Sequence, residues 1–491
     1  MDRFDVAIIG AGVVGTAIAR ELARYDLKVA VYDFGSDVCS GASKANSGVV
    51  HSGIYSRPGS LKARFCVEGN AMFDELSREL NIPMERIGKF VVTPDEDGVA
   101  ELEKLKAVGE ANGIPGMRMV SAKEVREKEP GIKCHQALLV PSAGITLPYK
   151  CTIALAENAA QNGVRFFLGS KVTNLSRSKD GYILKTQDGK KHTAKVVVNS
   201  AGLHCRDIIA MVEEPNFKVY PVRGEYLLID KEHNHLVHTL VYPVPPKDRA
   251  VVGVHVTPTI GGPLLIGPSS EPIDDPDDTA TTAEVMEMLL NEAQALIPEL
   301  PRRAVINGYS GVRCRSAPLE KGWIDYRIEE SRKNPGMINL IGIESPGLTG
   351  AVAIARYIVD IASRTVDLRP NPEFDPIRKT HKHFSELSNT QRANMIKKDS
   401  AWGRVVCRCE HVTEAEVVEA LENPLGARTL SAVKYRTQAG MGRCQGGYCT
   451  QHVVRILEKR FGLDLKDIKL KDSGSNMFTG PTRRKGGKPH G

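Results

Sequence analysis

Four cysteines in the C-terminal part of the chain have the residue type and spacing of metal ligands. Cys407 and Cys409 are separated by one residue, Cys444 and Cys449 by four, and 34 residues lie between the two pairs. Deprotonated cysteines are soft ligands that select zinc or iron–sulfur clusters. The spacing does not distinguish these two, so it predicts a four-cysteine metal centre of either kind.

A glycine motif near the other end of the chain indicates a dinucleotide site. Gly10, Gly12 and Gly15 form the pattern G-x-G-x-x-G, in which the glycines allow a tight turn, the approach of a pyrophosphate and close packing of a helix on a strand. The N-terminus of that helix offers N–H groups to the phosphates. Asp33, 18 residues after Gly15, is placed to accept a hydrogen bond from a ribose hydroxyl.

The elements that must position these residues follow from the hydrophobic pattern. An apolar run at residues 6–9 predicts a buried strand before the glycine turn, a helix follows it, and residues 28–32 predict a second strand that ends at Asp33. This strand, helix and strand supply the context that the glycine motif requires.

Three further stretches are expected to approach the same ligand. Residues 40–66 begin with small side chains that let backbone lie close to a flat molecule. Residues 195–202 predict a buried strand ending in small residues, which resembles the strand that covers the cofactor a second time in two-dinucleotide-fold flavoproteins. Residues 339–363 predict a strand, a Pro-Gly turn and an amphipathic helix whose N-terminus could face the cofactor. The expected contacts in these stretches are Ser43, Asn46, Ser47, Gly48, Ala201, Gly202, Gly342, Gly347, Leu348 and Thr349.

The amino-acid composition limits the kinds of protein that this chain can be. The chain has 491 residues, 41% hydrophobic and 25% charged, as in ordinary soluble proteins of several domains. The net charge of +7 includes four basic residues in the tail 473–491; without them it is +3, which does not indicate nucleic-acid binding. No apolar stretch approaches membrane-spanning length, and the first predicted strand begins almost at Met1, which leaves no room for a signal peptide. We therefore expect a cytoplasmic protein without a direct membrane span.

The motifs together resemble those of a known family. About the first 365 residues are similar to the D-amino-acid-oxidase superfamily of FAD enzymes. Four segments resemble a branch of this superfamily, the L-2-hydroxyglutarate dehydrogenases. They are NSGVVHSGIYSRPGSLKARFC (46–66), VRGEYLLI (222–229), LVYPVP (240–245) and GVHVTP (253–258). The complete chain, with IESPGLTG (343–350) and the cysteine unit, resembles the catalytic subunit of anaerobic glycerol-3-phosphate dehydrogenases.

The resemblance implies the cofactors and the fold. It implies FAD, with Val172 as a further contact, and the cysteines followed by AGMGRCQGGYC resemble the bacterioferritin-associated-ferredoxin-like domain, which holds a [2Fe–2S] cluster. The expected fold is α/β: a two-dinucleotide, Rossmann-like FAD-binding fold with an antiparallel-sheet substrate domain and a small C-terminal helical domain that contains the four cysteines. The expected limits are 1–85, 145–217 and 309–366 for FAD binding, 86–144 and 218–308 for substrate, 367–400 for a linker, 401–471 for the cluster domain and 472–491 for a disordered basic tail.

The resemblance also implies catalytic roles. Arg313 matches a family arginine over the flavin, where its fork of donors would bind the anionic group of the substrate; the alternative is a surface ion pair. Two histidines compete as the base: His51 lies in the loop that passes the flavin ring, and His255 matches a position that faces the substrate in the hydroxyglutarate branch. Arg315 is a weaker second candidate for the anion.

The expected activity is the FAD-dependent oxidation of sn-glycerol 3-phosphate to dihydroxyacetone phosphate. Electrons would leave through the [2Fe–2S] cluster to a further redox subunit, a flavoprotein or a small iron–sulfur protein, which could also attach the enzyme to a membrane. L-2-hydroxyglutarate or a related 2-hydroxy acid is the alternative substrate. A non-catalytic electron-transfer subunit that keeps its flavin is the alternative of another class.

Overall fold

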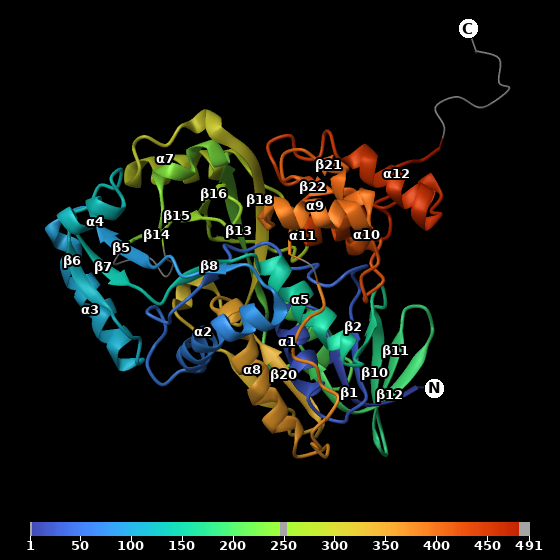
Figure 1. Cartoon of the computed structure of the whole chain (residues 1–491). Helices are drawn as coiled ribbons and strands as arrows, with labels where there is room; N and C mark the ends of the chain where they lie inside the picture. Colours follow the sequence, from blue (N-terminus) through green and yellow to red (C-terminus); the bar gives the residue numbers. More distant parts are fainter. Residues whose placement is uncertain (1, 246–252, 381, 481–491) are drawn as a thin grey trace, which may run out of the picture. The chain divides into compact units, whose positions relative to one another are not determined.

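The computed structural model describes residues 2–245, 253–380 and 382–480 of the chain (Figure 1). Two compact units are present. The first comprises Met1–Phe34 and Val38–Lys379, and the second comprises Gly35–Asp37 and Thr380–Gly491. Every helix among the described residues is too short or too polar to cross a membrane.

One of the two large sheets of the first unit is built around parallel strands (Figure 1). In spatial order its strands are β9 (Arg165–Phe167), β2 (Val29–Tyr32), β1 (Asp2–Ile9), β12 (Lys191–Asn199) and β20 (Met337–Ile341), each parallel to its neighbours. Antiparallel strands extend it at β10 (Val172–Ser178), β11 (Gly181–Thr186) and β19 (Arg327–Glu330). The central strands are nearly continuous apolar runs because helices cover them.

The helices of this region pack as a connected layer. Helix α1 (Val13–Leu22) contacts α5 (Pro148–Gln161) and α8 (Gly347–Ala362), and α8 also contacts α2 (Leu61–Leu80). The strand, helix and strand around the glycine motif therefore form as the sequence predicts, and the predicted α/β class is confirmed.

A second sheet of nine strands lies in the same unit. Its order is β17 (Glu271–Pro272), β13 (Tyr220–Ile229), β16 (Leu264–Gly267), β15 (His255–Pro258), β14 (Leu240–Pro243), β5 (Lys89–Thr93), β7 (Gln136–Val140) and β6 (Arg118–Ser121), with β18 (Val305–Arg315) also paired to β13. All pairs are antiparallel except β14 with β5. Strand β18 carries residues 309–315 into this sheet, beyond the limit predicted for the substrate domain.

The two faces of the second sheet pack against different apolar cores because side chains alternate along each strand. One face belongs to an apolar core that includes residues of helix α7 (Ala283–Leu296); its members on the strands are Phe90, Leu227, Val241, Val256 and Ile266. The neighbouring positions, which point to the opposite face, are Lys89, Tyr226, Tyr242 and His255. A row of polar and aromatic side chains therefore crosses one face of this sheet.

Shorter elements complete the first unit. A three-stranded sheet contains β3 (Val49–Val50), β8 (Gly144–Thr146) and β4 (Met84–Glu85), and the remaining helices are α3 (Val99–Ala111), α4 (Ala122–Lys128) and α6 (Cys205–Ile209).

The second unit is small and mainly helical, as predicted. It contains α9 (Asn389–Lys398), β21 (Val405–Cys407), β22 (Val412–Thr413), α10 (Glu414–Leu421), α11 (Leu430–Thr437) and α12 (Thr450–Phe461). Thr413 and Glu416 form a capping box at the start of α10. A core with Val412, Val433 and Leu457 packs beneath the cysteines.

The stretch predicted as a linker, residues 367–400, is structured in two parts. In the first unit, Asp375 N–H donates to Asn162 Oδ1 at 2.7 Å, and Arg378 forms an ion pair with Glu157 at 2.6 Å. In the second unit, α9 follows a Ser388 capping box. The predicted disordered tail begins with a turn in which Met477 N–H donates to the carbonyl oxygen of Ile468; residues 481–491 lie outside the described residues.

Candidate active site and cysteine centre

The turn between β1 and α1 has the close packing that the glycine motif predicts. Gly10 has a φ of 106°, and a Cβ atom there would lie 2.5 Å from the carbonyl oxygen of Ser200. A Cβ on Gly15 would lie 2.0 Å from the carbonyl oxygen of Gly10, so only glycine allows α1 to approach this turn. The buried Asp33 carboxylate accepts a hydrogen bond from the Ala11 N–H at 2.7 Å, which places it against the same turn.

The segment of small residues lies beside this turn. Ser43 Oγ accepts a hydrogen bond at 2.9 Å from the N–H of Val13, the first residue of α1. Asn46 folds the segment on itself, because its side chain donates to two carbonyl oxygens and accepts from the Gly48 N–H. Ser47 makes a side-chain hydrogen bond to strand β13. This segment therefore connects the dinucleotide turn to the second sheet.

Strand β18 supports the segment from the second sheet. The Tyr309 hydroxyl donates to the carbonyl oxygen of Asn46 at 3.1 Å. A Cβ on Gly311 would lie 2.0 Å from the carbonyl oxygen of Ala45, so the absence of a side chain lets the segment rest on the strand.

The start of helix α8 is tied to the same region. Thr349 Oγ1 accepts a hydrogen bond from the His51 N–H at 2.9 Å and donates to the carbonyl oxygen of Val49 at 3.4 Å. Gly342, with a φ of 71°, turns the chain after β20, and α8 begins at Gly347, followed by Leu348.

The predicted cofactor contacts meet at one edge of the parallel sheet. The glycine turn follows β1, Asp33 follows β2, Ala201 and Gly202 follow β12, and Gly342 follows β20. Parallel strands end at a common edge, which is where such sheets bind dinucleotides. The glycines let α1 pack closely on the turn after β1, as a dinucleotide-binding turn requires, so the residues at this edge fit FAD. Val172 opens β10 with its side chain in the core, so it would contact a ligand through its backbone.

The two candidate bases are both neutral at neutral pH. Burial is the main cause that lowers the pKa of His255 to about 3, followed by the positive charge of Lys89. Burial also lowers the pKa of His51, followed by the charges of Lys89 and His255. The structure thus brings the two histidines near each other. His255 Nδ1 lies 3.4 Å from the carbonyl oxygen of Gly253, which can only accept, so Nδ1 carries the proton.

The remaining nitrogen of His255 is free to accept a proton. Its Nε2 is buried and has no hydrogen-bond partner among the described residues. His51 Nε2 is 3.5 Å from Ser345 Oγ, a long contact that leaves it only weakly held. Each histidine therefore has a nitrogen that can accept a proton, although burial makes it a weaker base than a free imidazole, and the role of either as the base stays a prediction.

Sequence reasoning missed a polar cluster beside these histidines. Lys89 Nζ lies 3.9 Å from the ring centroid of Tyr242 and 5.3 Å from that of Tyr55. The Tyr242 ring stacks on His255 with centroids 3.9 Å apart and an angle of 13°. In the sequence, Lys89 opens an apolar strand, which is a common place for an exposed lysine. The signal that would have found it is the pairing of β5 with β14, which joins segments far apart in the chain.

Arg313 keeps unused donors on the predicted substrate side. Its Nη2 donates to Ser270 Oγ at 2.5 Å, while its Nε is buried without a hydrogen-bond partner among the described residues. Burial raises the pKa of Tyr226 to about 12, and the positive charge of Arg313 acts in the opposite direction, so the two side chains are close. The anion-binding role of Arg313 stays a prediction.

The weaker candidate Arg315 has a structural environment. It shares the buried carboxylate of Glu344 with Lys62, at 3.3 Å for Arg315 and 2.8 Å for Lys62. Arg315 also donates to the carbonyl oxygen of Gly322 at 2.6 Å. Both cations are thus held by one carboxylate, and the role of Arg315 as a second anion-binding candidate stays a prediction.

The four cysteines form two pairs in the second unit. Cys409 Sγ and Cys444 Sγ are 3.7 Å apart, and Cys407 and Cys449 make a side-chain hydrogen bond. Two thiolates on one tetrahedral metal at about 2.3 Å lie about 3.7 Å apart, so Cys409 and Cys444 have the spacing for one metal ion. Among the described residues, no three His, Cys, Asp or Glu side chains converge on a single-ion site. The charge of Cys407 acts on Cys444, and that of Cys444 acts on Cys449, so the two pairs lie close to each other.

Hydrogen bonds lower the pKa of one cysteine in each pair, Cys407 and Cys444, whereas the pKa of the partner, Cys449 or Cys409, is raised. A hydrogen bond from the Cys449 side chain is the main cause that lowers the pKa of Cys407 to about 5. The backbone N–H groups of Gly440, Glu410 and Cys409 also lower it, whereas burial raises it. The N–H of Tyr448 is the main cause that lowers the pKa of Cys444. Thiolates are the form that binds metals.

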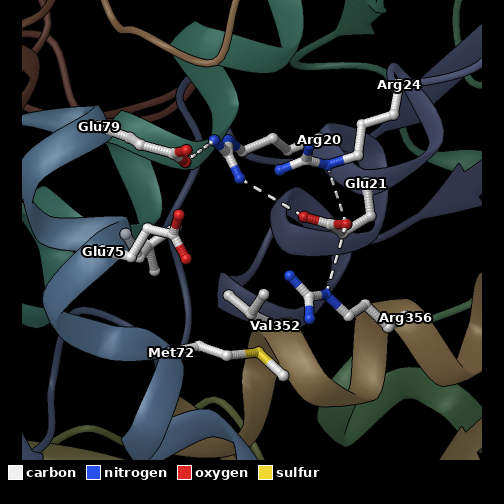
Figure 2. A pocket seen from close by; sticks show the side chains of 9 residues that line it. Arg20, Glu21, Arg24, Met72, Glu75, Glu79, Val352 and Arg356 are labelled. Atoms are coloured by element: carbon white, nitrogen blue, oxygen red, sulfur yellow. Dashed lines mark hydrogen bonds and ion pairs between the residues drawn. The ribbon is translucent and has the colours of Figure 1, made fainter.

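A cavity of about 150 Å³ lies elsewhere in the first unit (Figure 2). Its charges are paired: Arg20 with Glu79 at 2.6 Å, and both Arg24 and Arg356 with Glu21 at 3.1 and 3.8 Å. None of the predicted site residues lines it. We therefore assign it no part in the site.

Two family models match the chain. Residues 5–361 match the DAO model, described as FAD dependent oxidoreductase, and residues 405–459 match a BFD-like [2Fe-2S] binding domain. The first match contains the glycine turn, the histidines and Arg313, and the second contains the four cysteines.

Curated relatives and solved structures agree with these matches. A glycerol 3-phosphate dehydrogenase of Caloramator mitchellensis is 41% identical over 98% of this chain and 99% of its own length. A mitochondrial L-2-hydroxyglutarate dehydrogenase of Arabidopsis thaliana is 31% identical over 73% of this chain and 83% of its own. The structure of L-alpha-glycerophosphate oxidase from Mycoplasma pneumoniae with FAD bound superimposes with a TM-score of 0.73 at 27% identity, covering 78% of this chain and all of that one.

Proposed function

Because this chain belongs to the DAO family of FAD-dependent oxidoreductases, we propose that it oxidises sn-glycerol 3-phosphate to dihydroxyacetone phosphate. The chain is an enzyme whose cofactors are FAD in the first unit and a [2Fe–2S] cluster in the second. The proposal concerns its substrate, the roles of its residues and the path of the electrons.

The observation that carries the proposal is the charge pattern around the two histidines. Arg313 has a buried Nε without a partner, and His255 has a buried acceptor nitrogen. No described carboxylate forms an ion pair with Arg313, His51 or His255. A substrate that is both an alcohol and an anion matches such a site, since the alcohol gives a proton to a base and the anion needs a cation.

Each residue of the site has a separate role in the proposed reaction. Arg313 binds the phosphate, for which its planar fork of donors is suited. His255 or His51 accepts the hydroxyl proton as the carbon is oxidised. FAD, when bound, supplies the acceptor for the hydride. Gly10, Gly12 and Gly15 hold its pyrophosphate at the start of α1 and Asp33 holds its ribose.

The cysteine unit favours glycerol 3-phosphate over 2-hydroxyglutarate. The glycerol 3-phosphate dehydrogenase relative matches 98% of this chain, whereas the hydroxyglutarate relative matches 73%. The second candidate substrate, L-2-hydroxyglutarate, rests on His255 within GVHVTP and on the 31% identity of that relative.

Anaerobic reduction of the bound flavin tests the proposal. We expect glycerol 3-phosphate to bleach the flavin absorbance faster than 2-hydroxyglutarate, lactate or amino acids at equal concentration. Faster bleaching by 2-hydroxyglutarate would assign the second candidate. Absence of bleaching by any of these donors would overturn the proposed substrate class.

We further infer that the electrons leave through the cluster to a separate redox protein. A cluster held by four cysteines in the same chain supplies a one-electron carrier after the two-electron flavin. The acceptor would be a flavoprotein or a small iron–sulfur subunit, through which the enzyme could also associate with a membrane.

A further inference from the structure

Lys89 is a buried amino group without a counter-ion; burial lowers its pKa to about 7, so it is positively charged below that pH. Its residue is 1% exposed, and its Nζ has no hydrogen-bond partner among the described residues. No described carboxylate pairs with it, in contrast to the buried Lys62, which pairs with Glu344 at 2.8 Å. Burying an unpaired charge destabilises a protein, so we expect a lysine in the core of a sheet to have a function.

The groups around Lys89 belong to the candidate active site. Lys89 on β5, Tyr242 on β14 and His255 on β15 lie on adjacent strands, with Lys89 Nζ 3.9 Å from the Tyr242 ring centroid and the Tyr242 ring stacked on His255. Two further groups lie near Lys89. The ring centroid of Tyr55 is 5.3 Å from Lys89 Nζ, and the buried thiol of Cys66 on α2 is also close.

Several of these groups have unsatisfied polar atoms. Lys89 Nζ, the hydroxyls of Tyr55 and Tyr242, and His255 Nε2 are all buried without a partner among the described residues. Buried polar atoms are normally satisfied, so such a cluster marks a functional site. Tyr55, Tyr242 and Cys66 are kept neutral by burial, which raises the pKa of each thiol or hydroxyl.

We propose that Lys89 is a positioning residue whose buried positive charge, next to the Tyr242–His255 stack, keeps His255 and His51 in the neutral form that accepts a proton. It deepens the proposed function, on which it rests for the role of the two histidines. Lys89 does not touch the substrate in this proposal; it acts through the histidines.

The positive charge of Lys89 is needed because the proposed substrate is an anion. A negative charge near an imidazole stabilises its protonated form and raises its pKa, and a protonated imidazole accepts no proton. A positive charge on the other side acts in the opposite sense. The charge of Lys89 follows burial among the causes that lower the pKa of both His51 and His255. Removing the charge should therefore raise both pKa values toward the ordinary value.

Direct titration of the histidines tests the proposal without any substrate. The full-length holoenzyme, labelled at histidine Cε1, gives NMR signals from 13 histidines, of which two are assigned by the variants His51→Gln and His255→Gln. In the wild type we expect both to stay neutral down to about pH 5, below the ordinary value of about 6.5. In Lys89→Met we expect at least one apparent pKa to rise by about one unit or more.

A charge-retaining variant is the matched control. Lys89→Arg should titrate as the wild type does, because arginine stays protonated throughout. Lys89→Gln repeats the test if Lys89→Met binds no FAD. Unchanged histidine titrations in Lys89→Met or Lys89→Gln would overturn the proposal, and so would histidines that titrate near 6.5 in the wild type.

The pH dependence of turnover gives the second readout. The ratio of kcat/KM for Lys89→Met to that for the wild type cancels the ionisation of the phosphate substrate, and we expect it to fall as the pH falls below about 7. A ratio that is constant with pH would mean a purely structural role. If no alcohol reduces the wild-type flavin, the proposed function fails while the NMR titration still decides the role of Lys89.

Discussion

At the scale of single residues, the candidate site combines cations and neutral histidines without a carboxylate partner. Arg313 and Lys89 have buried nitrogens without a partner among the described residues, whereas Arg315 and Lys62 share Glu344. This difference is the basis for our proposal that Arg313 and Lys89 serve a ligand or a reaction. It also makes the roles of individual side chains testable one at a time.

Replacing Arg313 tests the anion site. In Arg313→Ala we expect KM for glycerol 3-phosphate to rise by orders of magnitude while FAD stays bound, because the phosphate loses a charged, forked donor worth about 2–5 kcal/mol. Lysine at this position should recover only part, since it is a point charge. Steady-state kinetics with flavin content as the control measure this. A near-normal KM in Arg313→Ala would reject the assignment.

Replacing each histidine identifies the base. Loss of the base should slow anaerobic flavin reduction by about 10²- to 10⁴-fold, whereas loss of a residue that only contacts the flavin should mainly change its affinity. Stopped-flow reduction of His255→Ala and His51→Ala compares the two. Wild-type rates in both variants would mean that neither accepts the proton.

The buried ammonium of Lys89 predicts a gain in stability when it is removed. Burial lowers its pKa from 10.5 to about 7, so between these values the unfolded chain holds a proton that the folded chain does not. Stability therefore falls as the pH drops from about 10.5 to about 7, and the full penalty, a few kcal/mol, remains below that range. Lys89→Met should melt at a higher temperature than the wild type at about pH 7. This difference should shrink toward about pH 10; a difference that did not depend on pH would point to packing instead.

At the scale of elements, close approach of backbone segments builds the cofactor site. Gly15 lets α1 lie on the turn after β1, and Gly311 lets the segment 42–48 rest on β18. The start of α8 is joined to the same region through Thr349. The site is therefore assembled by contacts that leave no space for a side chain.

A methyl group at Gly15 should disturb this assembly. The Cβ of Gly15→Ala would lie 2.0 Å from the carbonyl oxygen of Gly10, so α1 must move away from the turn. Such overpacking costs about 1–3 kcal/mol, and we expect a lower FAD content and a lower melting temperature. Gly131→Ala is the matched control, because its Cβ would meet no atom within 4 Å. Full FAD occupancy in Gly15→Ala would contradict the role of this contact.

At the scale of the whole molecule, the chemistry is divided between two compact units. The first contains the DAO match and the second contains the [2Fe–2S] match, so oxidation of the substrate and removal of the electrons are assigned to separate parts. A substitution that disrupts one unit should therefore leave the function of the other unit measurable.

Breaking the cluster should separate the two functions. In Cys409→Ser we expect single-turnover flavin reduction to stay near the wild-type rate, while turnover with the physiological acceptor collapses. Protein prepared without oxygen should contain about two irons per wild-type chain. Cys134→Ser, which changes a thiol far from the four ligands in sequence, is the control. One zinc and no iron in the wild type would contradict the relay.

The sequence alone determined the features that depend on local pattern. The glycines after the first strand, the capping box at Thr413 and the two cysteine pairs are each fixed by residue type and short spacing, and a strand or helix forms where its periodicity is strong. For the same reason the α/β class and the second, antiparallel sheet could be predicted.

Which side chains meet depends on contacts between segments that are far apart in the sequence. The pattern of a strand gives the face on which a residue lies, but the neighbour of that strand is set by contacts between distant segments. The pairing of β5 with β14 brought Lys89 to Tyr242 and His255, and the meeting of α2 with the loop after β20 gave Lys62 and Arg315 one carboxylate. The lowered pKa values of the histidines depend on that burial and on that neighbouring charge, neither of which is a local property of the sequence.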